Sequence, residues 1–251
     1  MIQLISSITL KQLIMKRTSL ILLLLLSVTI IRSQDKGNTR VPVLGEKAPS
    51  FSVQSTNGQI NFPKDFGRSW KVLFSHPQDF TPVCSSEVLE LAYMQSEFDK
   101  LNAKFLVLSV DSLNSHNDWK NAMEELNYKG RGPVKITVPI ASDRKYRVSR
   151  QYGMIHDASN DKKTVRGVFI IDPENTIQTI LYYPMSVGRN MDEIKRTLIA
   201  LQTVAQKNIS TPANWQEGND VLLQVKPTES ELKKAGDNIY ELAWFMIFQK
   251  I

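Results

Sequence analysis

Residues 70–87, WKVLFSHPQDFTPVCSSE, constrain the fold more than any other stretch of the 251-residue chain. The run begins as an apolar strand, His76-Pro77 breaks it, and a polar loop leads to a helix that starts at Pro82. The only cysteine, Cys84, falls in the first turn of that helix. There the unpaired backbone N–H groups and the positive end of the helix dipole favour the thiolate, the reactive form. The sequence therefore predicts thiol chemistry at a strand–loop–helix junction.

The cysteine count limits the redox chemistry that the chain can carry out. With a single cysteine, neither an internal disulfide nor a CxxC dithiol pair can form. The three histidines stand at scattered positions without the spacing of a zinc site, so we expect no metal and no cofactor. Metal-free thiol chemistry is the remaining expectation.

The formal net charge of +6 says less about partners than its size suggests. Four of the basic residues lie in residues 1–33, which hold no acidic residue. Nothing in the rest of the chain argues for a nucleic-acid partner. A hydrophobic content of 42% and a charged content of 22% are typical of a folded protein.

The N-terminus has the pattern of a targeting segment. Basic residues precede an apolar run at residues 20–31, which is shorter than a spanning helix needs. We predict that residues 1–33 are a secretory signal peptide and that residues 34–40 are a linker, so the mature protein is secreted or periplasmic. The alternative is an uncleaved segment that anchors the protein in the membrane.

Strand and helix patterns alternate after residue 41. Asn57-Gly58 is a two-residue hairpin signal, and Ser115 with Asp118 resembles a capping box that opens a helix. Strands are expected at residues 51–53, 60–62, 70–75, 105–110, 138–140, 164–171, 177–183 and 221–225, and helices at 82–101, from 115, at 146–152, from 190 and at 229–234. This order fits an α/β domain of the thioredoxin-like class, in which helices flank a central mixed sheet.

The spacing Pro77-x-x-x-Thr81-x-x-Cys84 resembles the active-site motif of the peroxiredoxins. The longer run FSHPQDFTPVC resembles the one-cysteine, peroxiredoxin-6-type branch, and similarity continues through DRKYRVSRQYGM, RGVFIIDP, YYPMSVGRNMDEI and TPANWQEGNDV. The resemblance implies a thioredoxin-like peroxidase domain over residues 41–204. It also implies a C-terminal dimerisation arm over residues 205–251, and hence a homodimer or a larger homo-oligomer.

The same resemblance implies a thiol-dependent peroxidase that acts on hydrogen peroxide and small alkyl hydroperoxides. Cys84 is then the nucleophile and becomes a sulfenic acid. Thr81 offers a hydroxyl that accepts a hydrogen bond from the peroxide and donates one to the thiolate. Pro77 shields the thiolate from bulk water.

Cationic and orienting groups are assigned by the matching blocks. Arg166, at a strand start in VRGVFI, takes the place of the family arginine, and its planar fork of donors suits a thiolate and peroxide oxygens. Arg189 resembles the second family arginine, and Glu87 is placed to orient both. His76 lies beside the pocket in the motif, with a purely structural histidine as an equal alternative, whereas His116 and His156 are expected on the surface.

No second cysteine is present to resolve the sulfenic acid, so an external thiol must reduce it. We expect this reductant to be thioredoxin-, glutaredoxin- or glutathione-like. A different class of function, a non-catalytic oligomeric holdase or scaffold, is the alternative hypothesis.

Some relatives of this branch are also phospholipases that use a serine in a GxSxG-like motif. Here Ser69 lies in GRSWK, Pro63 stands where a histidine would be expected, and Glu174 where an aspartate would. Without a histidine to act as the base, we predict no lipase activity.

Two features of the C-terminal region are not explained by the resemblance. The last residues, NIYELAWFMIFQKI, do not match the family tail, and their apolar content suggests burial at an interface. Asn208-Ile209-Ser210 is a glycosylation sequon, which matters only in a eukaryotic host.

Overall fold

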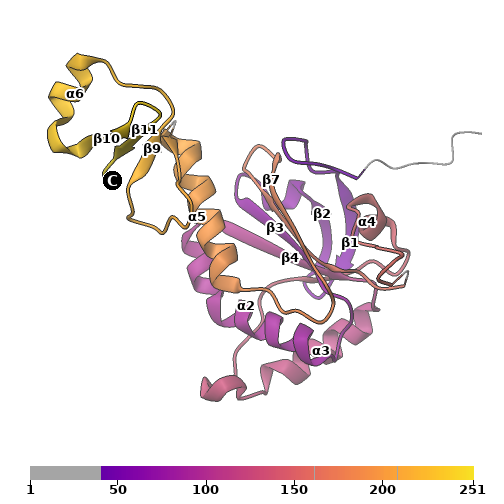
Figure 1. Cartoon of the computed structure of the whole chain (residues 1–251). Helices are drawn as coiled ribbons and strands as arrows, with labels where there is room; N and C mark the ends of the chain where they lie inside the picture. The colour runs from indigo at the N-terminus through magenta and orange to yellow at the C-terminus, as the bar shows by residue number, and fades with distance from the viewer. Residues whose placement is uncertain (1–40, 161, 208) are drawn as a thin grey trace, which may run out of the picture. The chain divides into compact units, whose positions relative to one another are not determined.

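A seven-stranded sheet organises the part of the chain that the structure describes (Figure 1). The computed structural model describes residues 41–160, 162–207 and 209–251. The predicted signal peptide and linker, and Asn208 of the sequon, lie outside these residues. Within the described ranges, no helix combines the length and the apolarity that crossing a membrane requires.

The strands lie in the order β2-β1-β5-β4-β3-β6-β7. They are β1 (Phe51–Ser55), β2 (Gly58–Phe62), β3 (Trp70–Ser75), β4 (Ala103–Ser109), β5 (Ile140–Ser142), β6 (Arg166–Ile171) and β7 (Ile177–Tyr183). Strands β3, β4 and β5 are parallel to one another, and β6 is antiparallel to β3, so the sheet is mixed. All six residues of β3 are buried because helices and loops cover both faces, which accounts for its almost continuous apolar pattern.

Alternate residues of β3 enter two separate cores, one on each face of the sheet. The helices of the sheet region are α2 (Pro82–Lys100), α3 (Leu113–Glu124), α4 (Arg147–Gln151) and α5 (Met191–Lys207). Val72 and Phe74 pack in the first core with residues of α2, α3 and α5, and Cys84 belongs to this core. Leu73 packs in the second core with Phe62 and Tyr152. The reactive junction is therefore fixed between the central strand and its covering helices.

Two local predictions are corrected by one or a few residues. Ser55 pairs with Gly58, so the hairpin loop consists of Thr56 and Asn57 and lies one residue earlier than predicted. Helix α3 begins after Ser112, whose side chain accepts a hydrogen bond from the backbone N–H of Ser115. The serine earlier in the chain is thus the N-cap, which leaves the Ser115 hydroxyl for another partner.

The C-terminal region forms a small antiparallel sheet in the order β10-β11-β9-β8. Its elements are β8 (Ile209–Ser210), β9 (Val221–Leu223), α6 (Glu229–Ala235), β10 (Ile239–Ala243) and β11 (Met246–Gln249). Trp215 is buried against Ile209, Val221 and Ile199 of α5. Helix α5 runs through residue 204, where the sequence placed the domain boundary, and thereby connects the two sheets.

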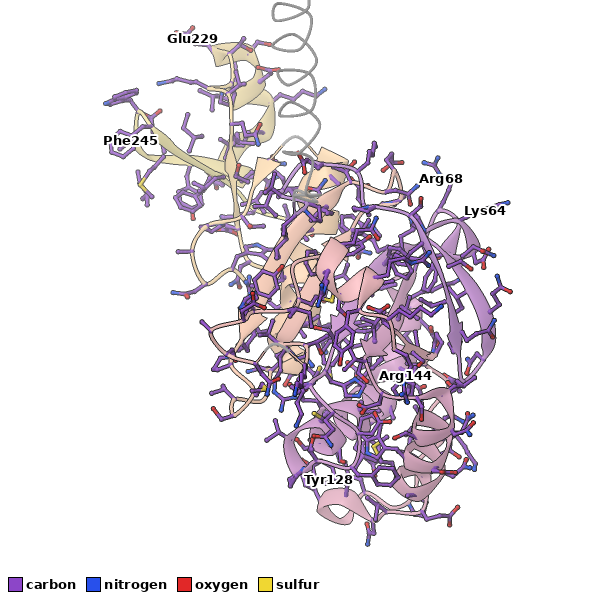
Figure 2. All side chains as sticks on the ribbon, turned by 90° about the vertical axis from the view of Figure 1, so that its right-hand side faces the viewer. Lys64, Arg68, Tyr128, Arg144, Glu229 and Phe245 are labelled. Atoms are coloured by element: carbon purple, nitrogen blue, oxygen red, sulfur yellow. The ribbon has the colours of Figure 1, made fainter. Side chains whose placement is uncertain are left out.

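The apolar tail forms the β10–β11 hairpin and is buried only in part within this chain. Ile247 is buried, whereas Trp244 and Phe245, in the turn between the two strands, are 77% and 67% exposed (Figure 2). The predicted burial at an interface stays a prediction, because it concerns a partner subunit.

Candidate active site

The loop between β3 and α2 delivers Cys84 to the first turn of the helix. Phe80 takes a positive φ of 54°, Thr81 is extended, and Pro82 is the first helical residue. A proline is favourable there because its missing N–H would have no partner in the helix. The Thr81 hydroxyl donates to the carbonyl of Gln78 at 2.9 Å and makes no capping bond. This hydroxyl thus braces the loop, and the predicted donation to the cysteine sulfur is not seen.

Cys84 is fully buried and lies next to a guanidinium group. Nη1 of Arg166 donates to Sγ of Cys84 at 3.3 Å, and β6 begins at this arginine. Pro77, also buried, lies at the start of the loop that leads into α2. The structure thus places a hydrogen-bond donor that is always positively charged directly against the buried sulfur.

Glu87 joins the two arginines that the sequence singled out. Its Oε2 accepts from Nη1 of Arg166 at 2.7 Å and from Nη2 of Arg189 at 2.6 Å. Its Oε1 accepts from the backbone N–H and Nε of Arg189 at 2.8 and 2.9 Å. Burial alone would raise the pKa of Glu87, but the hydrogen bonds and charge of Arg189 and the charge of Arg166 outweigh it and lower the pKa. The carboxylate is therefore ionised in the buried cluster.

Both guanidinium groups are also held by backbone carbonyls, and that of Arg189 packs on an aromatic ring as well. Arg166 donates from Nε and Nη2 to the carbonyl of Met185 at 3.0 and 2.6 Å. Arg189 donates to the carbonyl of Gly167 at 2.9 Å, and its Cζ lies 3.2 Å from the ring centroid of Phe74. Because Glu87 and the carbonyl of Met185 both hold the guanidinium group of Arg166, its Nη1 points to the sulfur in a defined direction.

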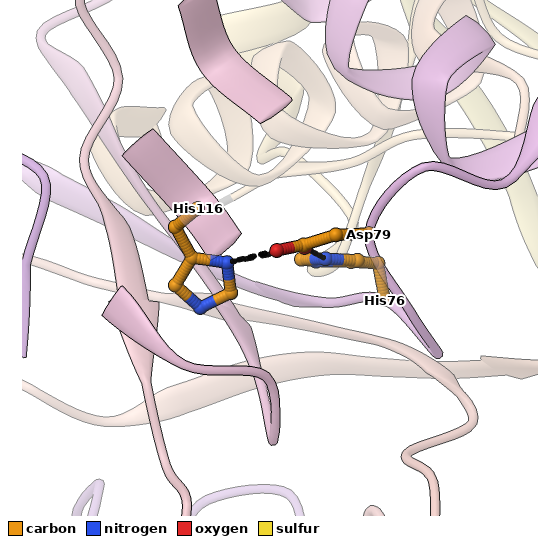
Figure 3. A group of neighbouring side chains, drawn as sticks. All are labelled: His76, Asp79 and His116. Carbon is orange, nitrogen blue, oxygen red and sulfur yellow. Dashed lines mark hydrogen bonds and ion pairs between the residues drawn. The ribbon is translucent and has the colours of Figure 1, made fainter. Parts of the chain in front are cut away.

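A second buried cluster anchors the same loop on its other side (Figure 3). Asp79 accepts from Nε2 of His76 and from Nδ1 of His116, each at 2.8 Å, and from the hydroxyl of Ser115 at 2.7 Å. Both histidines are fully buried, so the prediction of a surface position for His116 is wrong. Helix α3 carries His116 and Ser115 inward because its first turn faces the loop. His156, in contrast, is exposed as predicted.

Burial and hydrogen bonding set the charges in this second cluster. Burial lowers the pKa of His76 more than the hydrogen bond and charge of Asp79 raise it. For Asp79, burial alone would raise the pKa, but hydrogen bonds from His116 and His76 outweigh it and hold the pKa well below its ordinary value. Since a carboxylate only accepts, Nε2 of His76 carries the proton. Nδ1 of this ring is buried without a partner among the described residues.

The side chains of the second cluster are also of the kinds that bind metal ions; they are His76, Asp79 and His116. Their donor atoms lie within 4.8 Å of one another, and two histidines with one carboxylate suit several divalent metals. Here, however, the carboxylate oxygens already accept hydrogen bonds from both rings and from a serine hydroxyl. A metal would have to displace these protons in a fully buried space, so the arrangement fits a hydrogen-bonded anchor better.

Comparisons with known proteins identify the family. The profile of the AhpC/TSA family matches residues 44–180, and that of the C-terminal domain of 1-Cys peroxiredoxin matches residues 200–237. A peroxiredoxin of Methanosarcina mazei is 44% identical over 84% of this chain and 98% of its own length. The chain belongs to the one-cysteine peroxiredoxins. Bovine peroxiredoxin-6 is 40% identical over 76% of this peroxiredoxin and 87% of its own length.

Solved structures agree with this assignment. A yeast mitochondrial 1-Cys peroxiredoxin superposes with a TM-score of 0.75 at 37% identity, covering 84% of this peroxiredoxin and 100% of that chain. Peroxiredoxin 6 of Arenicola marina gives the same TM-score at 31% identity, covering 83% and 98%. The predicted thioredoxin-like fold with a C-terminal arm is confirmed, and the protein is a thiol peroxidase with a single cysteine.

The structure brings together most residues that the sequence proposed for this peroxiredoxin. Cys84, Arg166, Glu87 and Arg189 form one contact network, and His76, Pro77 and Thr81 lie on the adjoining loop. Their catalytic roles stay predictions. Sequence reasoning missed Asp79, His116 and Ser115. Asp79 could have been noticed in the sequence, because it lies three positions after His76. Its other partners, Ser115 and His116, lie in α3, more than thirty residues away, and no local pattern indicates them.

The residues of the lipase-like motif do not form a hydrolytic site in this peroxiredoxin. The hydroxyl of Ser69 donates to Oδ1 of Asn102 at 2.8 Å. Glu174 pairs with Arg68 at 2.8 Å on the surface. The hydroxyl of Ser69 thus has an amide oxygen as its hydrogen-bond partner, and the absence of lipase activity stays a prediction.

Proposed function

We propose that this protein reduces hydrogen peroxide and small alkyl hydroperoxides, with Cys84 as the attacking thiolate and Arg166 as its cationic partner. The single observation that carries the proposal is the hydrogen bond from Nη1 of Arg166 to Sγ of Cys84. Glu87 and Arg189 act behind this contact by holding the guanidinium in place.

In the oxidation step, the thiolate attacks one peroxide oxygen and the O–O bond breaks. The second oxygen leaves as hydroxide or alkoxide and takes a proton from water, while Cys84 becomes a sulfenic acid. Arg166 stabilises the negative charge as it moves from sulfur to the leaving oxygen. Thr81 accepts a hydrogen bond from the peroxide, because its own proton is directed to Gln78. Pro77 limits the access of water.

In the reduction step, an external thiol attacks the sulfenic acid, which gives a mixed disulfide with Cys84 and one water molecule. A second thiol attacks the mixed disulfide, which releases Cys84 and a disulfide of the two external thiols. The single cysteine supports this route, because neither the chain nor a second copy of it contains a resolving thiol. The external thiol is thioredoxin-, glutaredoxin- or glutathione-like.

The proposal extends to assembly and location. Residues 200–237 match the C-terminal domain of 1-Cys peroxiredoxin, which supports a homodimer or a larger homo-oligomer formed through the predicted arm over residues 205–251. The exposed apolar side chains of the β10–β11 hairpin support the same assembly. The basic and apolar pattern of residues 1–33 supports export through a signal peptide, with an uncleaved membrane anchor as the alternative. Mass spectrometry of the exported protein would report its first residue.

The decisive experiment follows peroxide consumption with a thiol reductant in the wild type and in Cys84→Ser. We expect rapid consumption in the wild type and none in the variant, together with the addition of one oxygen atom to wild-type Cys84. A protein that suppresses the aggregation of other proteins but leaves peroxide untouched would instead support the holdase hypothesis.

A further inference from the structure

A cleft of about 460 Å³ opens beside the loop that leads to Cys84. Pro77 and Gln78 of that loop form one wall, and Ser112 and Ser115 at the start of α3 form another. Helix α3 has twelve residues, and the carboxylate of Asp79 accepts hydrogen bonds from Ser115 and His116 at its N-terminal end. The side chains that line the cleft therefore set its net charge.

Three basic side chains complete the cleft: Arg144, Lys162 and Lys163. Arg144 and Lys162 are exposed, and neither side chain has an ion-pair partner among the described residues. Lys163 donates to Oε1 of Gln78, which ties the cationic wall to the loop. The one carboxylate in the lining, Asp111, already accepts from the backbone N–H of Asp79 and from a serine hydroxyl, both at 2.9 Å. Three basic side chains against this one carboxylate leave the lining with a surplus of positive charge.

The cleft is connected to the reactive sulfur through the loop itself. The carbonyl of Gln78 accepts the hydroxyl of Thr81, three residues before Cys84. Cys84 is 0% exposed, so a thiol, which is bulkier than peroxide, reaches its sulfur only when the covering residues are displaced. A molecule held in the cleft lies against Pro77 and Gln78, at the start of the loop that leads to Cys84.

We propose that this cleft binds the carboxylates of a small acidic thiol, and that this thiol is the reductant of oxidised Cys84. The ligand class follows from the charge: carboxylates pair with Arg144, Lys162 and Lys163, and the thiol group is left free to attack the sulfenic acid. The inference rests on the proposed function, since it concerns the second half of the same reaction.

The test compares three reductants: glutathione, its diethyl ester and cysteamine, which are anionic, neutralised at the carboxylates and cationic, respectively. Cys84 is first oxidised with one equivalent of peroxide, and the rate of its reduction by each thiol is then measured. For Arg144→Glu and for Lys162→Glu, we expect reduction by glutathione to slow roughly tenfold. Reduction by the ester and by cysteamine, which each carry one net positive charge, should be at least as fast as in the wild type. Added salt should reduce the glutathione effect.

Lys64→Glu is the matched control, because Lys64 is an exposed lysine that lies well apart from Arg144 in Figure 2. It makes the same change in net charge and should leave all three rates unchanged. If the cleft variants slow the three thiols equally, or if Lys64→Glu slows glutathione as much, the inference is wrong. The rate of oxidation by peroxide is measured in the same samples and should not change. A Cys84 that fails to react with peroxide would instead overturn the proposed function.

Discussion

Arg189 donates three hydrogen bonds to the carboxylate of Glu87, from its backbone N–H, Nε and Nη2, at 2.6 to 2.9 Å. The same carboxylate accepts Nη1 of Arg166, the atom that also donates to the sulfur of Cys84. Through this shared carboxylate, Arg189 helps to fix the direction of the guanidinium group that donates to the sulfur. Because the whole cluster is buried, loss of one charge leaves the others uncompensated.

Replacing the central carboxylate should therefore affect both stability and rate. We expect Glu87→Gln to lower the free energy of unfolding by about 3 kcal/mol, because it leaves two buried guanidinium groups without their counter-charge. Oxidation of Cys84 should slow at least roughly tenfold, since Arg166 is no longer held in one orientation. Urea unfolding and stopped-flow measurement with peroxide check the two values.

Glu97→Gln is the control for that variant. Glu97 pairs with Lys195 on the surface, where one partner is 47% exposed and the other 28% exposed. Loss of such a pair costs about 0.5 kcal/mol and should leave the oxidation rate unchanged. Equal effects of the two substitutions would contradict the role assigned to Glu87.

The geometry of the guanidinium, and not only its charge, should matter at Arg166. In Arg166→Lys the positive charge remains, but one ammonium group cannot contact Cys84, Glu87 and the carbonyl of Met185 together. We expect the second-order rate constant for peroxide to fall about a hundredfold. Arg196→Lys, which alters a surface arginine paired with Glu193, should react at the wild-type rate.

Buried His76 should make the protein less stable as the pH falls. Its pKa is below the ordinary value of 6.5 in the folded state, so the unfolded chain binds more protons once the pH drops below that value. This group thus contributes stability that is full above pH 6.5 and decreases by up to about 1.4 kcal/mol per pH unit below it. Urea unfolding between about pH 7 and pH 5 measures the slope.

The variant His76→Gln keeps a donor for Asp79 and removes the titration. Its stability should depend less on pH over this interval, whereas His156→Gln, at an exposed position, should follow the wild type. The neighbouring groups that also face His76, namely Asp79, His116 and Asp111, are present in all three proteins. If the free energy of unfolding changes equally with pH in the wild type and in His76→Gln, the imidazole of His76 is not buried in its neutral form.

Ser69 should be inert toward esters. Its hydroxyl is committed to Asn102 and has no histidine beside it to remove the proton. We expect no ester hydrolysis above the background in the wild type, and none in Ser69→Ala. Hydrolysis that disappears in Ser69→Ala would show that a group other than Asn102 activates the serine.

The sequence by itself determined the reactive thiol, the junction that carries it and the alternation of strands and helices. These features depend on contacts between near neighbours: a strand of buried residues, a proline at a helix start and a cysteine in the first turn. The family motif added Arg166, Glu87 and Arg189 as candidates, although no local pattern distinguishes these residues from surface charges.

Only the tertiary structure decided which charged groups are buried together. Arg166 meets Cys84 from a position 82 residues away, and His116 meets Asp79 across 37 residues. The prediction for His116 was wrong because helical periodicity does not show which polar side chain of α3 will face a loop. Hydrogen-bond partners so far apart in sequence are chosen by the packing of the sheet and its helices. That packing placed the ionised carboxylate of Glu87 against Arg166, and the ionised carboxylate of Asp79 between His76 and His116.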